Sequence, residues 1–525
     1  MKIFALISFL ISVLEFSDGA KILGVFAHNG LSHYMVFEPL MIELARKGHQ
    51  VVVISRFPPK EKVPNFEHVD VNSDTFDSTG NVSFSMFKRL PVSDIENLEE
   101  LYEDLLETEG ILNSKNFLNF MNSNQKFDVM VTETFVSRLF YALPYKFKVP
   151  MITLSSSVMM PWASYDIANP ITPSYIPCHF SPHGDKMNFF QKLENVYSLV
   201  VYALAFEIFF YRKDEELKKK YFGEDVPSLR DIAKNISLTM SHTHFTYNRP
   251  RPLIPQVIEI GGLFIKESKP IPQNIEKFIN ESKHGVVYFC MGSLLRGETF
   301  PPEKREAFLY AFSKIPQRVL WKWEGDVLPG KSDNIMISKW MPQRDILAHP
   351  NVKLFISHGG LLGTSEAVYE GVPVLGIPIF GDQRTNIKSL EANGAGELLD
   401  YNEISKEVVL EKIQRLLNDP KYKENAKLLS DRYRDRPMSP LDTAVYWTEY
   451  VIRHKGAPHL RTAAADMPWY QYLLLDVIAF IVAVLVAGLL IIYYTTKFIL
   501  RAIYGLICGG GAKKGSSKSD KKKRN

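Results

Sequence analysis

A pattern of strand, glycine-bearing turn, helix and strand occurs twice in this 525-residue chain, and no other feature constrains the fold as strongly. The first copy comprises a strand at residues 21–27, a helix at 34–49 and a strand at 50–55. The second comprises a strand at 285–290, a helix at 302–315 and a strand at 318–323. Strands that alternate with helices predict parallel sheets with helices on both faces. We therefore expect an α/β protein with two doubly wound domains.

A segment at residues 248–264 separates the two copies and carries three prolines and two glycines, which is typical of a linker. We place the first domain at residues 21–250, the linker and the start of the second domain at 251–284, and the second domain at 285–460. When two such domains face each other, they leave a cleft between the C-terminal edges of their sheets. Ligands bind at that edge in this architecture.

The N-terminus has the pattern of a secretory signal peptide. Lys2 is followed by an almost wholly apolar run at residues 3–14 and by small residues at 17–20. We expect this peptide, residues 1–20, to be removed near Gly19 or Ala20, so the mature chain enters the secretory pathway. Three Asn-x-Ser sequences are candidate glycosylation sites: Asn81, Asn235 and Asn280.

An uncharged stretch of 20 residues at 477–496 lies between Asp476 and Lys497. At ~1.5 Å per residue it is ~30 Å long, so we predict a transmembrane helix. The tail that follows ends in residues 511–525, which hold seven Lys or Arg and one Asp, whereas the whole chain is only +4. The positive charge therefore belongs to the tail, and it gives no indication of nucleic-acid binding. It predicts a single-pass type I protein with a cytoplasmic tail at residues 497–525.

The last five residues, KKKRN, resemble a dilysine retrieval signal through Lys522 and Lys523 and favour residence in the endoplasmic reticulum; the alternative is a plain stop-transfer anchor. Of the three cysteines, Cys178 and Cys290 are expected in the lumen and Cys508 near the tail, which excludes a disulfide scaffold. The apolar stretch at 196–211 is too short to span a bilayer, so we interpret it as a core or surface-seeking helix. A role in an acceptor pocket or in membrane contact is the alternative.

The sequence SHGGLLGTSE at residues 357–366 follows an apolar run at 352–356. We expect a buried strand, a glycine turn and then a helix at 362–370 capped by Gly371. That arrangement directs backbone N–H groups and the positive end of a helix dipole at one point, which suits a phosphate. An ordinary tight turn is the alternative.

Residues on both sides of this turn supply a partner for each part of a nucleotide sugar. An indole can stack on a base, an amide can bond ribose or base edges, and a carboxylate can accept from both ribose hydroxyls. Asp-Gln after a strand can hold the hydroxyls of a sugar. The residues concerned are Trp340, Gln343, His358, Glu366, Asp382 and Gln383. Taken singly, a core Trp, a surface Gln or a structural His would each be an adequate interpretation.

The window at residues 340–383 closely resembles the donor-binding signature of the UDP-glycosyltransferases. The segments 285–293 and 434–461, the anchor and the Lys-rich tail are similar to those of membrane-bound animal members, invertebrate ones especially. The resemblance implies the GT-B architecture of two facing Rossmann-like domains. It also implies transfer of a sugar from a UDP-sugar to an acceptor.

The resemblance assigns a role to each donor-site residue. Trp340 would stack on uracil and Gln343 would contact the uridine. His358 with the N–H groups of Gly359 and Gly360 would hold the diphosphate, aided by Ser293. Glu366 would bind the ribose, and Asp382 with Gln383 the transferred sugar. Many relatives carry Asn at the position of Leu362; here Gly363, Thr364 or Ser365 is expected to substitute for it.

Transfer requires a base for the acceptor hydroxyl, and a neutral His suits this because its pKa lies near physiological pH. His28 and His33 both lie in the first glycine turn, and the catalytic His of the family matches His33. A helix-capping or merely buried His is the alternative. Two carboxylates flank the strand at 127–135: Asp128 opens it and Glu133 closes it. Only the closing end faces the cleft, so we predict that Glu133 orients His33, at a position where most vertebrate relatives have Asp.

The sequence predicts a metal-independent, inverting hexosyltransferase with no cofactor, in which the UDP-sugar is the co-substrate. The part of the chain assigned to the lumen has no Asp-x-Asp metal motif, and helix N-terminus, His358 and Ser293 would stabilise the departing UDP. We expect glucose as the sugar and a small lipophilic hydroxyl compound as the acceptor, as in detoxification. Glucuronic acid stays open because of Lys322, as do transfer to a lipid or glycan and a homo-oligomeric state. The alternative function is an inactive relative that binds hydrophobic ligands or partners.

Overall fold

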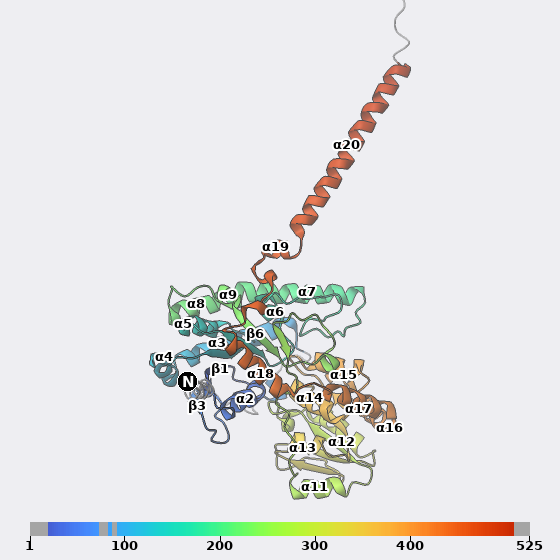
Figure 1. Ribbon diagram of the computed structural model, residues 1–525. Helices are drawn as coiled ribbons and strands as arrows, with labels where there is room; N and C mark the ends of the chain where they lie inside the picture. Colours follow the sequence, from blue (N-terminus) through green and yellow to red (C-terminus); the bar gives the residue numbers. More distant parts are fainter. Residues whose placement is uncertain (1–18, 73–81, 87–91, 509–525) are drawn as a thin grey trace, which may run out of the picture. The chain divides into compact units, whose positions relative to one another are not determined.

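The computed structural model describes residues 19–72, 82–86 and 92–508, and the chain divides into a unit that ends at Thr462 and a unit that begins at Ala463 (Figure 1). Asn81, the tail at 511–525 and all but the last two residues of the predicted signal peptide lie outside the described residues. The first unit contains two parallel sheets, and the second contains a long apolar helix.

Seven parallel strands form the first sheet in the order β3-β2-β1-β4-β5-β6-β7. The strands are β1 (Lys21–Phe26), β2 (Gln50–Ser55), β3 (Phe66–Asp70), β4 (Val129–Glu133), β5 (Met151–Ser155), β6 (Ile236–Ser241) and β7 (Val257–Glu259). The central strands are apolar on both faces because helices cover both faces of the sheet. Ile22 therefore enters one core cluster, and its neighbour Leu23 enters the cluster on the opposite face.

The helices connected to this sheet are α2 (Leu31–Arg46), α3 (Asp94–Leu112), α4 (Lys115–Asn122), α5 (Ala142–Phe147), α6 (Pro161–Asp166), α7 (Phe189–Ala205), α8 (Tyr211–Phe222), α9 (Leu229–Ala233) and α10 (Phe245–Asn248). A single π turn, η3 (Phe206–Phe210), joins α7 to α8, so the two form one long helical rod. The apolar stretch predicted at 196–211 lies within that rod.

The second sheet has six parallel strands in the order β10-β9-β8-β11-β12-β13. The strands are β8 (Val286–Cys290), β9 (Arg318–Lys322), β10 (Ile335–Ser338), β11 (Val352–Ser357), β12 (Val374–Gly376) and β13 (Gly396–Leu398). The helices are α11 (Gln273–Asn280), α12 (Pro302–Phe312), α13 (Gln343–Leu347), α14 (Leu361–Glu370), α15 (Gln383–Ala392), α16 (Lys406–Asn418), α17 (Pro420–Arg434) and α18 (Pro440–Arg453). The predicted α/β class with two doubly wound sheets is confirmed.

Two segments belong to different parts of the fold than we expected. Residues 257–259, assigned to the linker, form β7 and pair with β6 at the edge of the first sheet, where flanking prolines are tolerated. Helix α18, assigned to the second domain, packs against α2 and contributes Ala444 and Val445 to the core of the first sheet. The domain boundaries otherwise stay a prediction, since both sheets belong to one compact unit.

The second unit contains α19 (Trp469–Tyr472) and α20 (Leu475–Cys508), and α20 includes the stretch predicted to span a membrane. Among the described residues, two helical segments are long and apolar enough to cross a bilayer by length and composition. One is α20, and the other is the rod from Phe189 to Phe222, which belongs to the first unit.

Candidate active site

The predicted site residues follow the strands at which each sheet reverses its order. In the first sheet this reversal lies between β1 and β4, and in the second between β8 and β11. Ligands bind outside the carboxyl ends of the strands at such reversal points. His28 and His33 follow β1, Glu133 ends β4, Ser293 follows β8, and His358 follows β11.

His33 and Glu133 are in direct contact. His33 lies in the first turn of α2, and its Nδ1 is 2.6 Å from Oε1 of Glu133. The Ser156 Oγ lies 2.8 Å from the same carboxylate oxygen, to which it donates, and 2.9 Å from Nδ1 of His33. Because an ionised carboxylate only accepts, this network assigns the imidazole proton to Nδ1 and leaves Nε2 able to take a proton.

The surroundings keep Glu133 ionised although it is buried. Burial raises its pKa, but the charge that His33 carries when protonated, the hydrogen bond of His33 and that of Ser156 outweigh burial and hold the pKa below its usual range. Phe135 lies edge-on to the His33 ring, with centroids 4.7 Å apart. A charged carboxylate on Nδ1 would stabilise the imidazolium that forms when Nε2 accepts a proton.

His28, the other candidate base, has both ring nitrogens engaged. Its Nδ1 accepts from the backbone N–H of Gly30 at 2.8 Å, and its Nε2 lies 3.3 Å from Asp104 Oδ2. The His28 ring stacks on the ring of His33, with centroids 4.1 Å apart. This geometry favours His33 as the base and gives His28 a packing role.

The glycine turn after β11 encloses the ring of His358. A Cβ on Gly360, or on Gly292 in the turn after β8, would lie 2.6 Å from that ring, so a larger residue at either position would displace it. Gly359 has φ of +90°, and a Cβ there would meet Ile387. Burial, with a smaller contribution from the charge of Lys322, lowers the pKa of His358 to about 4, so the ring is neutral at physiological pH.

The predicted uridine contacts lie on α13 and α14. Gln343 Nε2 donates to Glu366 Oε2 at 2.7 Å, which joins the residue expected at the base to the residue expected at the ribose. Burial raises the pKa of Glu366 to about 7, while the hydrogen bond from Gln343 and the charge of Arg344 oppose the shift. Gly363 lies beneath this pair: a Cβ there would be 3.1 Å from Gln343 Nε2. Trp340 is 67 % exposed just before α13, so its indole is accessible for stacking.

Asp382 and Gln383 lie at the start of α15. Asn386 donates to Asp382 Oδ2 at 2.9 Å. Burial raises the pKa of Asp382, and the hydrogen bond from Asn386 and the charge of a protonated His33 oppose the shift in part. Gln383 is buried, and its Oε1 accepts from the backbone N–H groups of Ile379 and Phe380. That contact shapes the turn, and the sugar contact expected of Gln383 stays a prediction.

The departure at Leu362 has a packing reason. The Leu362 side chain is partly buried against the core of the first sheet. An Asn at this position would place a polar amide against apolar side chains, at a cost in free energy. The neighbouring Thr364 is fully buried, and its hydroxyl accepts from Tyr247 at 2.7 Å. The Thr364 hydroxyl is therefore already engaged in a contact that joins the two halves of the unit. Gly363 and Ser365 are buried as well, so a phosphate contact from residues 363–365 stays a prediction. Ser293 is exposed in the turn after β8.

Sequence reasoning missed Ser156 and Asn386. Ser156 directly follows β5, the neighbour of β4, so its place after an apolar strand was a usable signal. Asn386 donates both to Asp382 and to the backbone carbonyl of Gly359, at 3.0 Å for the latter. It thereby joins the sugar part of the predicted site to the phosphate turn, and its position inside a helix gave no such indication.

The remaining features lie away from this site. A cavity of 920 Å³ is lined in part by the residues that precede β5 and begin β6. It therefore lies at the amino ends of these strands, whereas the predicted site lies at the carboxyl ends. Within the described residues, no group of three or more His, Cys, Asp or Glu is arranged to hold a metal ion. Asn235 and Asn280 are both exposed, as glycosylation requires.

Comparison with known proteins identifies the class of this site. The family described as "UDP-glucoronosyl and UDP-glucosyl transferase" matches residues 20–509. The chain is 57% identical to UDP-glycosyltransferase UGT5 of Dactylopius coccus, with 96% of each chain covered. It is 41% identical to UDP-glucosyltransferase 2 of the same species, covering 100% of this chain and 99% of that one. It is 34% identical to UDP-glucuronosyltransferase 2B13 of Oryctolagus cuniculus, covering 92% and 93%.

A solved structure of the glycotransferase of kitacinnamycin has the same fold, with a TM-score of 0.57 at 16% identity over 84% of this chain and all of that one. The calicheamicin glycosyltransferase CalG4 has a TM-score of 0.55 at 18% identity, over 83% and 99%. These two likenesses show the GT-B fold alone. The family match and the relatives define a glycosyltransferase enzyme that uses UDP-sugars. The chain belongs to the UDP-glucuronosyl and UDP-glucosyl transferase family.

Proposed function

We propose that this enzyme transfers glucose from UDP-glucose to a hydroxyl of a small lipophilic acceptor, with His33 as the general base and Glu133 as its orienting carboxylate. The observation that carries the proposal is the 2.6 Å contact between His33 Nδ1 and Glu133 Oε1 at the reversal point of the first sheet. The contact leaves Nε2 as the proton acceptor, which is the requirement for general-base catalysis.

The reaction is a single displacement. The acceptor oxygen bonds to the anomeric carbon while its proton passes to Nε2 of His33. The bond from the anomeric carbon to the diphosphate oxygen breaks, and UDP leaves with the electron pair. One displacement inverts the anomeric configuration, so an α-linked donor gives a β-glycoside. Holding both substrates in one cleft supplies the proximity that the reaction needs.

The donor site would stabilise the leaving diphosphate without a metal. The backbone N–H groups of Gly359 and Gly360 precede α14, and the positive end of that helix dipole favours negative charge. His358 is neutral, so it would contribute a hydrogen bond and no charge. Trp340, Gln343 and Glu366 would bind the uridine, Asp382 the sugar hydroxyls, and Ser293 a phosphate oxygen.

The ion pair of Lys322 supports glucose over glucuronic acid. Lys322 Nζ lies 2.5 Å from Glu324 Oε1, so its charge is already compensated and is not free for a sugar carboxylate. One relative is named a UDP-glucosyltransferase, and it is more similar to this chain than the rabbit glucuronosyltransferase.

The signal peptide, the apolar α20 and the basic tail support a single-pass enzyme of the endoplasmic reticulum membrane. Residues before α20 would lie in the lumen, and the tail would lie in the cytoplasm. Lipophilic acceptors accumulate in such membranes, which agrees with the proposed acceptor class.

The test is UDP release by microsomes that express the chain, with a panel of phenols and either UDP-glucose or UDP-glucuronic acid. We expect release with UDP-glucose and its loss in His33→Ala. The matched control His284→Ala alters an exposed histidine in the turn before β8, at the opposite end of that strand from the predicted site. Binding of UDP without turnover of either donor would contradict the proposal and favour the inactive relative.

A further inference from the structure

Helix α7 and the π turn η3 present large apolar side chains to solvent along one face. These side chains recur at steps of three and four residues, which places them on one side of a helix. Their exposed fractions lie between 42% and 73%: Phe189, Leu193, Val196, Val200, Leu204 and Ile208. We call these six residues the apolar stripe. A continuous exposed apolar surface of this kind marks an interaction site.

The opposite face of the helix is fixed to the first unit, so the stripe is not needed to hold the helix in place. Buried Asn195 accepts from the backbone N–H of Cys178 at 2.6 Å and donates to two carbonyl groups. The Tyr202 hydroxyl donates to Asp94 at 3.2 Å. Phe206 stacks on Trp162.

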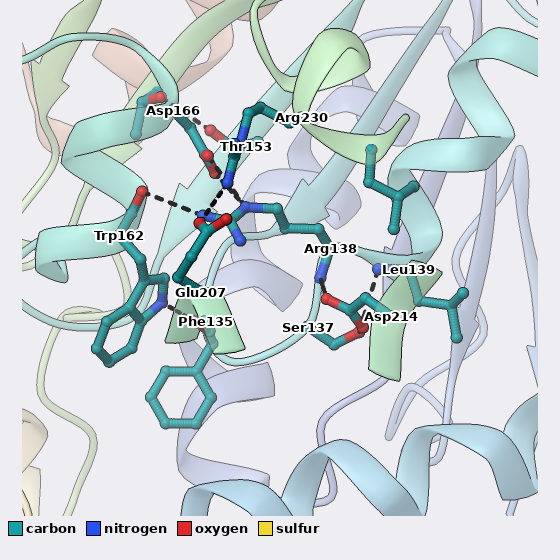
Figure 2. A network of polar contacts seen from close by, with 12 residues as sticks. Phe135, Ser137, Arg138, Leu139, Thr153, Trp162, Asp166, Glu207, Asp214 and Arg230 are labelled. Atoms are coloured by element: carbon teal, nitrogen blue, oxygen red, sulfur yellow. Dashed lines mark hydrogen bonds and ion pairs between the residues drawn. The ribbon is translucent and has the colours of Figure 1, made fainter. Parts of the chain in front are cut away.

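The rod that carries the stripe does not itself cross a membrane. Its α8 part contains two buried charged residues, Asp214 and Lys218. Figure 2 shows Asp214 accepting from Ser137 and from the backbone N–H of Arg138, while the Arg138 side chain pairs with Asp166. Removing this network from the unit would leave charges unpaired in hydrocarbon, at a high cost in free energy.

We propose that the apolar stripe is a membrane-contact surface that lies in the lipid interface with the helix axis parallel to the bilayer. An interfacial helix inserts one apolar face to the depth of the acyl boundary, and long cationic side chains reach the headgroups. Residues 195–206, in the middle of the stripe, contain no charged residue, and the exposed Lys192 and Arg212 lie beyond them on either side. The exposed carboxylates within the span of the stripe, Glu194 and Glu207, contact His183 and Arg230.

The length of the tether favours a bilayer over a second protein. Only the 12 residues 463–474 separate the first unit from α20. Fully extended, they reach at most ~40 Å, so a bilayer that holds α20 is present at a high effective concentration. A partner protein would need a groove that matches a convex single-helix surface, and the six residues of the stripe carry no hydrogen-bonding side chain to fix such a partner.

Three aromatic side chains connect the buried face of the helix that carries the stripe to the predicted base. Phe206 on the buried face stacks on Trp162, whose indole N–H donates to the carbonyl of Phe135. The Phe135 ring contacts His33. Membrane contact would therefore connect the predicted base, through these side chains, to the source of lipophilic acceptors. This consequence rests on the proposed function, whereas the experiment below does not depend on activity.

The test places an environment-sensitive fluorophore on the stripe of the full chain in phosphatidylcholine vesicles. Cys178 and Cys290 are buried and Cys508 is exposed, so Cys508→Ser provides the background. Val200→Cys introduces the label on the stripe, and Val327→Cys is the matched control at an exposed valine of the second half. We expect the label at position 200, but not at 327, to shift to the blue and to lose roughly half of its emission or more to nitroxides on the acyl chains.

A second pair of variants shows whether the stripe itself inserts. Leu204→Glu, added to Val200→Cys, is expected to abolish both the shift and the quenching, whereas Leu428→Glu on α17 leaves them unchanged. Emission at position 200 that matches position 327 would overturn the proposal. A blue shift that grows with the protein-to-lipid ratio and resists the lipid nitroxides would also overturn it, because a second copy would then cover the stripe.

Discussion

His33 and Glu133 are 100 residues apart in the chain, yet Nδ1 of one lies 2.6 Å from Oε1 of the other. The contact exists because β1 and β4 are parallel neighbours, so the turn after β1 and the last residue of β4 meet at one edge of the sheet. Glu133 is longer than Asp by one methylene. Ser156, which directly follows the neighbouring strand β5, donates to the same carboxylate oxygen and so holds the longer side chain in place.

Glu133→Gln is expected to lower kcat by about 10³- to 10⁴-fold, since the amide holds the ring without its charge and permits the wrong tautomer. Glu133→Asp keeps the charge but shortens the reach, so we expect a smaller loss. Steady-state kinetics on microsomes provide the measurement. Asp128→Asn, at the opposite end of the strand, is the control that should keep full kcat. Equal activity of Glu133→Gln and the wild type would exclude Glu133 as the orienting residue.

Ser156→Ala removes one hydrogen bond to Glu133 and one contact with His33. A hydrogen bond to a charged group contributes about 1.5–3 kcal/mol, so we expect kcat to fall about 10- to 100-fold. KM for the donor should stay unchanged, because Ser156 belongs to the half of the unit that does not bind UDP. Ser156→Thr, which keeps the hydroxyl, should recover part of the activity. A donor KM that rises with an unchanged kcat would argue against this positioning role.

The sequence predicts the strand-turn-helix units well because each has a local cause. The run at 352–356 is apolar, Gly371 adopts the left-handed conformation expected of a C-cap, and β11 and α14 form within one residue of the expected bounds. β7 and α18 were misplaced because edge pairing and packing on α2 depend on distant partners. The contacts of Ser156 and Asn386 depend on distant partners as well. Ser156 reaches Glu133 only when the ends of β4 and β5 lie side by side, and Asn386 reaches Gly359 only when two turns meet.

Gly360→Ala is expected to weaken UDP-glucose binding about tenfold or more, since a Cβ would lie 2.6 Å from Nε2 of His358 and displace the ring. The backbone at Gly360 has φ of −60°, so the substitution adds a steric effect and no backbone strain. Titration calorimetry with UDP-glucose measures the loss. Gly110→Ala on α3, where a Cβ meets nothing within 4 Å, should bind as the wild type does. Unchanged affinity in Gly360→Ala would remove His358 from the donor site.

The raised pKa of Glu366 predicts that donor binding depends on pH. Its pKa is raised to about 7, so in the free protein the carboxyl is protonated below that pH. Ribose hydroxyls that donate to the carboxylate favour its ionised form, so binding lowers the pKa and releases a proton. Affinity for UDP-glucose should therefore rise with pH up to about 7 and then level off, by at most about tenfold per pH unit. In Glu366→Gln, the affinity for UDP-glucose should not rise with pH over this range.

Glu366 should also make the stability of the free protein depend on pH, but with the opposite sign: the free energy of unfolding should fall as the pH rises. A carboxyl whose folded pKa is about 7, against an ordinary 4.5, is stabilised in its protonated form. Its contribution to the free energy of unfolding is therefore present below the unfolded pKa and falls as the pH rises through the interval up to about 7. Glu366→Gln lacks this loss, so its melting temperature should exceed that of the wild type above pH 7 while its donor affinity is lower. A variant that is weaker in both respects would show that Glu366 has a structural role instead of binding the ribose.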